Sequence, residues 1–199
     1  MPSNSNNSRT VIRARWIVPV TQPPIENGQV VIADGRIIAI ENASRQQCDV
    51  DYGDAVILPG LVNAHTHLEL THMRGQVPFI ESFTDWLRGV VALQTVAGAE
   101  ASLAASMREG FAQSLAAGVT TLADIGCGHW AADAWRASPV NIVGFFEAIG
   151  MGPRRCVPHM RAIEKTITDC QLMQSAPLND SMSRIFGISP HAPYSTGPE

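Results

Sequence analysis

The stretch "LPGLVNAHTHLEL", residues 58–70, decides the fold: an apolar run typical of a buried parallel strand ends in His65 and His67. Residues two apart on a strand point to the same face, so both imidazoles can reach one ion from the same side. Histidine is the commonest ligand of transition metals in such sites. Two histidines without an ion are the alternative, and for an isolated pair that is the more frequent case. The place of this pair, at the end of an apolar run containing Pro59-Gly60, favours a metal site.

Helical patterns alternate with further apolar runs downstream of the histidine pair. Residues 99–117 are predicted to form a helix, because apolar side chains recur every four residues and Gly118 is a suitable stop. Shorter helical patterns cover residues 130–137 and 159–173. The runs that we expect to be strands are "VTTLADIG" (119–126), "VNIVGFFEAIG" (140–150) and the start of "RIFGISPHAPYS" (184–195). Strands that alternate with helices indicate right-handed βαβ units and a parallel sheet.

A different pattern occupies residues 11–57, which we predict to be a small all-β unit that follows a flexible tail of residues 1–10. Two segments, "VIRARWIVPV" and "GQVVIADGRIIAI", have the composition of strands. Asp34-Gly35 lies between alternating apolar residues, which is a strong hairpin signal. The two parts of the chain therefore differ in class, the first all-β and the second α/β.

Polar side chains stand at the carboxyl ends of the four predicted parallel strands, and these are His65 with His67, Asp124, Glu147 and His191. Chemistry at this edge is typical of a (β/α)8 barrel. We therefore predict an α/β protein in which the small all-β unit of residues 11–57 precedes part of a barrel. Residues 58–199 are predicted to form about four βα units, the first half of a TIM-type barrel. Such a barrel needs eight strands and about 250 residues, so we expect this chain to supply only half of it.

Composition and charge narrow the class of protein. Of the 199 residues, 45% are hydrophobic and 16% charged, which fits a well-cored globular protein. A net charge of -4 without a basic run gives no sign of nucleic-acid binding. The polar N-terminus lacks the apolar core of a signal peptide, and no apolar run approaches the roughly 20 residues of a membrane span. The four cysteines form no Cys-x-x-Cys pair, so we expect a reducing, cytoplasmic setting and no membrane partner.

Three motifs carry a resemblance to a known family. "ILPGLVNAHTHLEL" resembles the first barrel strand of the amidohydrolase superfamily, and "GVTTLADIG" resembles its second. "GISPHAPYS" resembles the fourth strand of the subgroup of metal-dependent aminohydrolases and chlorohydrolases. With "FFEAIG", the set is similar to aminodeoxyfutalosine deaminases. Binuclear members such as dihydroorotase have a carboxylated lysine on the fourth strand. This chain has no lysine there, which favours a mononuclear site. The His-x-Glu and Pro-Cys-x-x-Cys pattern of cytidine-type zinc deaminases is absent.

The resemblance implies a metal-dependent hydrolase. It also implies that residues 11–57 are the N-terminal part of the family's small β-sandwich domain, and that the chain is the N-terminal half of a longer enzyme. His65 and His67 are expected to hold one divalent ion, Zn²⁺ or alternatively Fe²⁺, which lowers the pKa of bound water toward about 7. The other ligands and the acid–base residues are expected beyond Glu199, so no catalytic residue is assigned within the chain. The implied reaction is hydrolytic deamination of a purine-like or nucleoside-like small molecule. The alternatives are a chlorohydrolase or other amidohydrolase at the same site, and an inactive fragment or scaffold without a complete metal site. The sequence does not decide whether the protein forms a homo-oligomer.

Three of the four predicted substrate contacts stand near strand ends. His191 is expected by resemblance to contact substrate, and the alternative is that it orders its own loop. Glu147 is expected to recognise a polar edge of the substrate, or else to form a salt bridge at the rim. Glu69 shares the face of the histidine pair if that strand continues, and the alternative is an ion pair with Arg74.

The fourth predicted substrate contact is Trp86. It closes "Phe83-Thr-Asp-Trp86", which is similar to an F-x-x-W motif of the family, and would wall the substrate pocket. Simple packing is the alternative, since large aromatic side chains usually pack. The remaining polar candidates are expected to have no direct role: Asp124 as a structural residue, His72 in a loop, and His129 and His159 at the surface.

Overall fold

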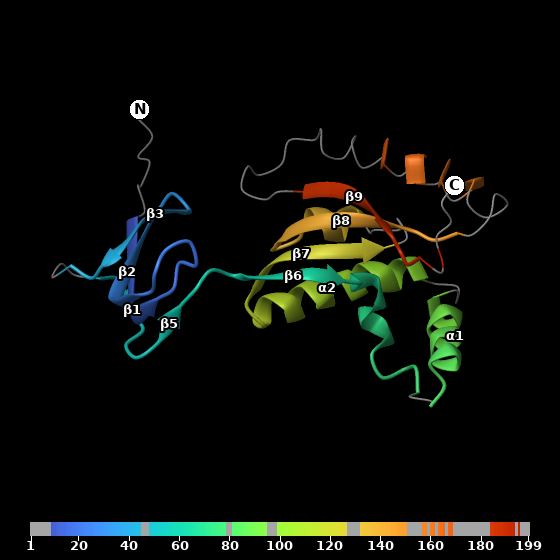
Figure 1. Ribbon diagram of the computed structural model, residues 1–199, viewed down its shortest axis with the longest axis horizontal. Helices are drawn as coiled ribbons and strands as arrows, with labels where there is room; N and C mark the ends of the chain where they lie inside the picture. Colours follow the sequence, from blue (N-terminus) through green and yellow to red (C-terminus); the bar gives the residue numbers. More distant parts are fainter. Residues whose placement is uncertain are drawn as a thin grey trace. The chain divides into compact units, whose positions relative to one another are not determined.

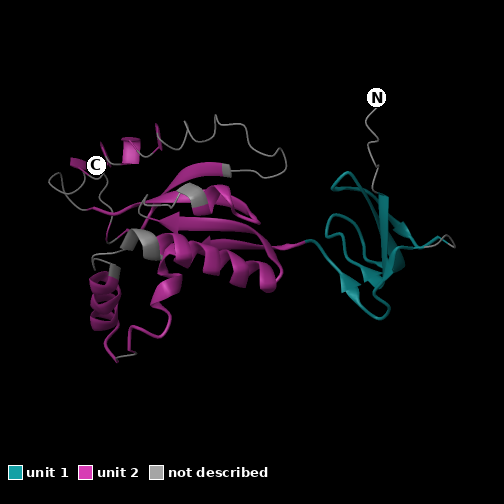
Figure 2. Cartoon of the chain, turned by 180° about the vertical axis from the view of Figure 1, so that it is seen from behind, with its two compact units in different colours: residues 1–59 teal, residues 60–199 magenta. Residues whose placement is uncertain are grey.

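The computed structural model describes residues 9–44, 48–78, 81–94, 99–126, 132–150, 184–193 and 195, with short stretches between Val157 and Thr168. The chain divides between Pro59 and Gly60 into two units, shown in teal and magenta in Figure 2. The predicted boundary lies two residues earlier. The predictions for tail residues 1–8 and for His129 and His159 fall outside the described residues.

The first unit is built on one mixed sheet (Figure 1). Its strands are β1 (Arg9–Ile17), β2 (Ile25–Ala33), β3 (Arg36–Asn42), β4 (Val50–Asp51) and β5 (Val56–Ile57). The first three pair antiparallel in the order β3-β2-β1, while β4 and β5 run parallel to β1. The described residues of this unit therefore form one sheet, and the second layer of the predicted sandwich is not among them.

The hairpin between β2 and β3 follows the sequence signal. Asp34 has φ 51° and Gly35 has φ 72°, the left-handed values that a type I′ turn requires at both central positions. At the other end, β1 already begins at Arg9, which is paired with Ala33. The prediction that Arg9 and Thr10 belong to a flexible tail is therefore wrong, because both residues are held in the β1–β2 ladder.

The second unit is built on a parallel sheet, as predicted (Figure 1). Its strands are β6 (Leu61–Thr66), β7 (Val119–Gly126), β8 (Asn141–Ala148) and β9 (Arg184–Pro190). They lie side by side in sequence order, and every neighbouring pair is parallel. Sequential order distinguishes this sheet from a doubly wound sheet, in which the strand order reverses.

The apolar run before the histidine pair is two strands rather than the single strand that was predicted. β5 ends at Ile57 in the first unit, and β6 begins at Leu61 in the second. Pro59 has no N–H to give to a ladder. A Cβ at Gly60 would collide with the side chain of Thr120, so the backbone can pass β7 this closely only at a glycine.

Four helical segments accompany the parallel sheet, and these are η1 (Leu68–Met73, a 3₁₀ helix), α1 (Phe83–Gln94), α2 (Ala99–Ala116) and α3 (Ala132–Arg136). α2 confirms the predicted long helix, and Gly118 follows it with φ 80°. Leu115, expected on its apolar face, is 45% exposed. α1 was not predicted. The described residues between Val157 and Thr168 are also helical. In the described part of the chain, no helix combines the length and the apolar character that crossing a membrane requires.

The helices cover one face of the parallel sheet. A buried core joins η1, α2 and α3 to β7 and β8, and its members are Leu68, Met107, Phe111, Leu122, Ala134, Trp135, Val140 and Ile142. Phe146 on β8 packs on the same side, against Ile163. Because side chains alternate along a strand, Glu147 points to the opposite face. That opposite face is much more open, with Val62 66% and Ile185 54% exposed.

Candidate active site

The two predicted metal ligands lie where β6 ends. His65 is the last residue but one of the strand, and His67 follows Thr66, the last. The Asn63 side chain accepts a hydrogen bond from the His65 amide at 3.1 Å. The His67 carbonyl accepts one from the Leu70 amide at 3.0 Å, which opens the 3₁₀ helix η1. The two imidazole centroids are 5.2 Å apart and the ring planes are inclined by 70°. The two rings are therefore direct neighbours.

Asp124 holds the chain immediately after His67. Its carboxylate is 1% exposed and accepts a hydrogen bond from the Leu68 amide at 2.8 Å. Asp124 is also the register partner of Thr66 across the β6–β7 ladder. It lies on the helix-covered face, two residues beyond the core residue Leu122. The register of β6 shifts between Asn63 and Thr66, so that Thr66 shares this face with Asp124. His65 and His67, the neighbours of Thr66, are therefore turned toward the other face. This arrangement agrees with the structural role predicted for Asp124.

Ser106 on α2 is a residue that the sequence reasoning missed. Its hydroxyl is 2% exposed and lies 2.9 Å from the Leu68 carbonyl and 3.1 Å from the Glu69 carbonyl. The same oxygen accepts a hydrogen bond from the His72 amide at 3.0 Å. Four residues further along α2, a Cβ on Gly110 would lie 2.6 Å from Leu68 Cδ2. The available signal was this small pair at helical spacing beside the apolar positions of α2.

Glu147 and His191 stand together at the ends of β8 and β9. Glu147 is 9% exposed, and its Oε1 lies 3.9 Å from Nε2 of the more exposed His191. The His191 amide donates to the Ala148 carbonyl at 3.1 Å, so the residue after β9 is still attached to β8. His191 Nδ1 lies 2.6 Å from the hydroxyl oxygen of Ser195. The alternative expected for Glu147 was a salt bridge at the rim. The structure places Glu147 within ion-pair distance of His191, which is itself one of the predicted substrate contacts.

Glu69 lies at a position that differs from the one expected. β6 ends at Thr66 and Glu69 lies in η1, so the idea that Glu69 shares a continuing strand face is wrong. Asp124 and Ser106 hold the backbone in the 3₁₀ turn at this point. Trp86 lies within α1, half-buried, with its ring centroid 5.8 Å from that of Phe83.

The separation of the His65 and His67 rings can be compared with that of two imidazoles bound to one zinc ion. Zinc-bound nitrogens lie about 2.0–2.1 Å from the ion, so two tetrahedrally placed imidazoles have centroids roughly 5 Å apart. The observed 5.2 Å is compatible with that arrangement. Within the ranges that the structure describes, no group of three or more His, Cys, Asp or Glu side chains is placed to hold an ion.

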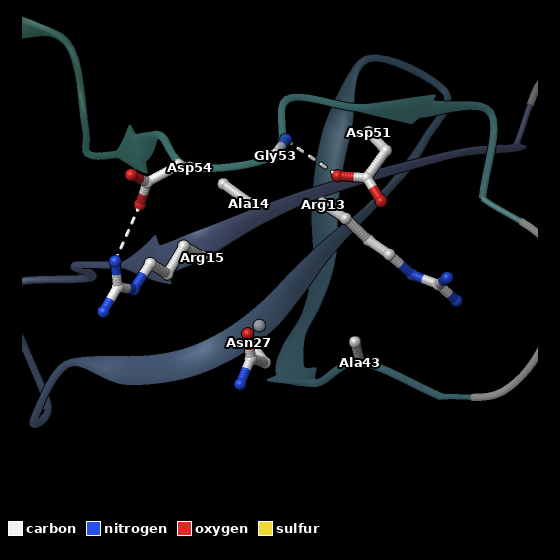
Figure 3. Close-up of a pocket in the computed structure, with 9 residues that line it drawn as sticks. Arg13, Ala14, Arg15, Asn27, Ala43, Asp51, Gly53 and Asp54 are labelled. Atoms are coloured by element: carbon white, nitrogen blue, oxygen red, sulfur yellow. Dashed lines mark hydrogen bonds and ion pairs between the residues drawn. The ribbon is translucent and has the colours of Figure 1, made fainter.

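A separate pocket lies wholly within the first unit (Figure 3). It encloses about 510 Å³ and has charged walls. Arg15 pairs with Asp54 at 2.9 Å, and Asp51 accepts a hydrogen bond from the Gly53 amide at 2.8 Å. No predicted site residue lines this pocket. The candidate active site is therefore the carboxyl edge of the parallel sheet.

Comparison with known sequences gives a family match and a long pairwise match. The model of the amidohydrolase family matches residues 56–199. A 5-methylthioadenosine/S-adenosylhomocysteine deaminase from Syntrophobacter fumaroxidans is 32% identical over 187 residues. That match covers 86% of this chain and 39% of the relative. The chain thus spans about two-fifths of the length of this relative.

Comparison with solved structures identifies similar folds. Helicobacter pylori aminofutalosine deaminase in complex with methylthio-coformycin matches with a TM-score of 0.74 and 22% identity, over 94% of this chain and 45% of that one. A zinc-bound adenosine deaminase from Xanthomonas campestris matches with a TM-score of 0.67 and 21% identity, over 94% and 43%. At these identities the likeness concerns the fold.

Proposed function

The chain belongs to the amidohydrolase family, and from that membership we propose that it serves the metal-dependent hydrolytic deamination of an adenosine-like nucleoside. One observation carries the proposal: polar side chains suited to binding an ion and a polar ligand stand at the carboxyl ends of parallel strands, facing away from the helices. These side chains are His65, His67, Glu147 and His191. The choice of substrate is supported by the relative named as a deaminase of 5-methylthioadenosine and S-adenosylhomocysteine.

The parallel sheet is proposed to be part of a (β/α)8 barrel. Its strands follow one another in sequence order, and the described segments η1, α2 and α3 pack on one face of the sheet, as in the wall of such a barrel. In that architecture the open face, with Val62 and Ile185, is the barrel interior. Active sites of these barrels lie at the carboxyl ends of the strands. This proposal explains why the polar side chains gather at that end.

His65 and His67 are proposed to hold one divalent ion, Zn²⁺ first and Fe²⁺ as the alternative. When bound, such an ion activates water for attack on the ring carbon that carries the amino group. The zinc-bound fold neighbour supports the choice of zinc. The protein's own part is to fix the two imidazoles, which Asp124 does by anchoring the Leu68 amide directly after His67.

His191 and Glu147 are proposed to bind and orient the substrate. A carboxylate and an imidazole with 3.9 Å between Oε1 and Nε2 present an acceptor and a donor side by side. Such a pair suits the polar edge of a purine nucleoside, whose ring nitrogens accept hydrogen bonds and whose hydroxyls donate them. Trp86 is proposed to contribute an aromatic wall. Glu69, displaced into η1, is proposed to contact the substrate from the turn after the histidine pair.

Ammonia release tests the proposal. The purified protein is offered 5-methylthioadenosine, S-adenosylhomocysteine and adenosine in the presence of Zn²⁺. We expect His65→Ala and His67→Ala each to lower kcat/KM by at least about 100-fold, since even residues that only support metal ligands cost 10–100-fold. His72→Asn is the matched control, because His72 lies in η1 and bonds the Glu69 carbonyl. This variant should retain most of the activity.

Other outcomes identify the other readings of the site. If activity is retained in both His65→Ala and His67→Ala, the assignment of these residues as metal ligands is wrong. Chloride release from a chlorinated triazine, without ammonia from any nucleoside, would make the protein a chlorohydrolase. If neither product forms and zinc does not bind, the chain is an inactive fragment or a scaffold without a complete metal site.

A further inference from the structure

The turn that follows β9 is fastened at several points around Ser195. The Ser195 amide donates to the Ala192 carbonyl at 3.0 Å, and the Gly150 amide donates to the Ser195 carbonyl at 2.8 Å. The Ser195 hydroxyl oxygen lies 2.6 Å from His191 Nδ1 and 3.2 Å from the Ala192 carbonyl oxygen. The backbone of Ser195 is therefore tied both to its own turn and to the end of β8. Its hydroxyl is presented to one edge of the His191 ring.

A hydroxyl has one proton, and the distances decide which neighbour receives it. The 3.2 Å separation from the Ala192 carbonyl exceeds the usual O–H···O range of about 2.5–3.0 Å. The 2.6 Å separation from Nδ1 is shorter. The shorter contact assigns the proton of Ser195 to Nδ1, which in that arrangement is the unprotonated nitrogen of a neutral imidazole. In the opposite arrangement Nδ1–H donates to the Ser195 hydroxyl and the hydroxyl donates to the Ala192 carbonyl, and that outcome would overturn the assignment.

The other edge of the ring leads to the same assignment. Nε2 lies 3.9 Å from Glu147 Oε1, and a carboxylate favours a nitrogen that carries a proton over one that presents a lone pair. Glu147 is 9% exposed, so little water screens this contact. Two independent neighbours, Ser195 on Nδ1 and Glu147 on Nε2, thus select the same tautomer.

We infer that Ser195 is a positioning residue, which fixes His191 as the Nε2–H tautomer and aims that N–H along the carboxyl edge of the sheet. The inference rests on the proposed function, because it assigns His191 as a hydrogen-bond donor to an acceptor atom of the substrate, such as a ring nitrogen. Without Ser195, the ring loses its partner on Nδ1 and can rotate or change tautomer. The donor then points at the substrate for only part of the time.

Nitrogen NMR tests the inference without relying on activity. With ¹⁵N-labelled histidine at mildly alkaline pH, where imidazoles are neutral, the Nδ1 shift reports whether that nitrogen accepts a hydrogen bond. His191→Asn identifies the His191 signals by their loss. In Ser195→Ala the Nδ1 shift should move toward that of a nitrogen without a hydrogen bond, and in Ser195→Thr it should stay in place. Ser114→Ala, a serine change on α2, should leave it unchanged.

Activity provides the second readout. Because a neutral hydrogen bond contributes about 0.5–1.5 kcal/mol, Ser195→Ala should lower kcat/KM for the nucleoside by about 2- to 13-fold, and Ser195→Thr should recover most of it. If Ser195→Ala does not fold, Ser195→Cys takes its place, since a thiol is only a weak donor. An unchanged Nδ1 shift in the folded variant, or a wild-type spectrum with the proton on Nδ1, overturns the inference. If the spectra behave as expected while no nucleoside releases ammonia, the proposed function fails and the positioning role stands.

Discussion

The buried side chain of Asp124 holds the backbone next to the histidine pair. Its carboxylate stands on the helix side of β7, yet its partner is the Leu68 amide, the first N–H after His67. Leu68 is itself 2% exposed, so this amide has little access to water. The bond fastens the backbone at the start of η1, directly after His67.

Asp124→Ala should therefore lower the free energy of unfolding of the second unit by about 1–3 kcal/mol, the cost of leaving a buried donor without a partner. Urea unfolding followed by helical circular dichroism measures this, because every helix that the structure describes belongs to the second unit. Asp124→Asn keeps an oxygen acceptor at the same place and is the control. An Ala variant as stable as the Asn variant would contradict the anchoring role.

At the scale of elements, the contact between α2 and η1 determines where the candidate site stands. The Ser106 hydroxyl lies within hydrogen-bond distance of two carbonyls of η1. Gly110 lets the backbone of α2 come close to Leu68 and Thr71. A Cβ on Gly110 would lie 2.6 Å from Leu68 Cδ2 and 2.9 Å from Thr71 Oγ1. The packing of α2 against η1 thus helps to hold the turn that follows the histidine pair in place.

Gly110→Ala should destabilise the second unit although alanine is the better helix former. Overpacking at a tight contact costs about 1–3 kcal/mol, which over most of that range is more than the gain in helix propensity of about 1 kcal/mol. Gly89→Ala on α1 is the matched control, because its Cβ would meet only Val77 Cγ1, at 3.1 Å. Thermal unfolding should show a lower midpoint for Gly110→Ala and little change for Gly89→Ala. Equal midpoints for the two variants would show that α2 does not constrain η1.

The same scale shows where sequence patterns were insufficient. The apolar period of α2 and the Asp34-Gly35 turn are local signals, and both elements form as predicted. The close approach of Gly60 to Thr120, which is distant in sequence, cannot be read from the run around Pro59-Gly60 itself. The end of β6 likewise depends on Asp124, and the pattern "HTHLEL" alone does not contain that information.

At the scale of the whole molecule, the parallel sheet has one covered and one open face. The open face presents Val62 and Ile185, which are more than half exposed. Apolar surface of this kind favours association. β6 and β9 are also the outer strands of the described sheet, and outer strands present unpaired backbone groups.

We expect the 199-residue chain by itself to self-associate through this open face. The paired change Val62→Thr with Ile185→Thr should shift it toward the monomer in size-exclusion chromatography with light scattering. Ile37→Thr with Ile38→Thr is the matched control, since these side chains are 62% and 60% exposed in the first unit. If only the control pair reduces association, the contact belongs to the first unit. A monomeric wild-type chain would contradict the prediction outright.

The sequence by itself determined the class of each unit, the parallel strands, the long helix α2 and the polar positions at the strand ends. These follow from periodicity and turn chemistry, which act over a few residues. Only the tertiary structure decided that β6 stops before His67, that Glu69 lies in a 3₁₀ turn, and that Ser195 and Glu147 hold the two edges of His191. Those outcomes depend on contacts between residues far apart in the chain. A local sequence pattern does not specify such contacts, because they form only when packing brings the residues together.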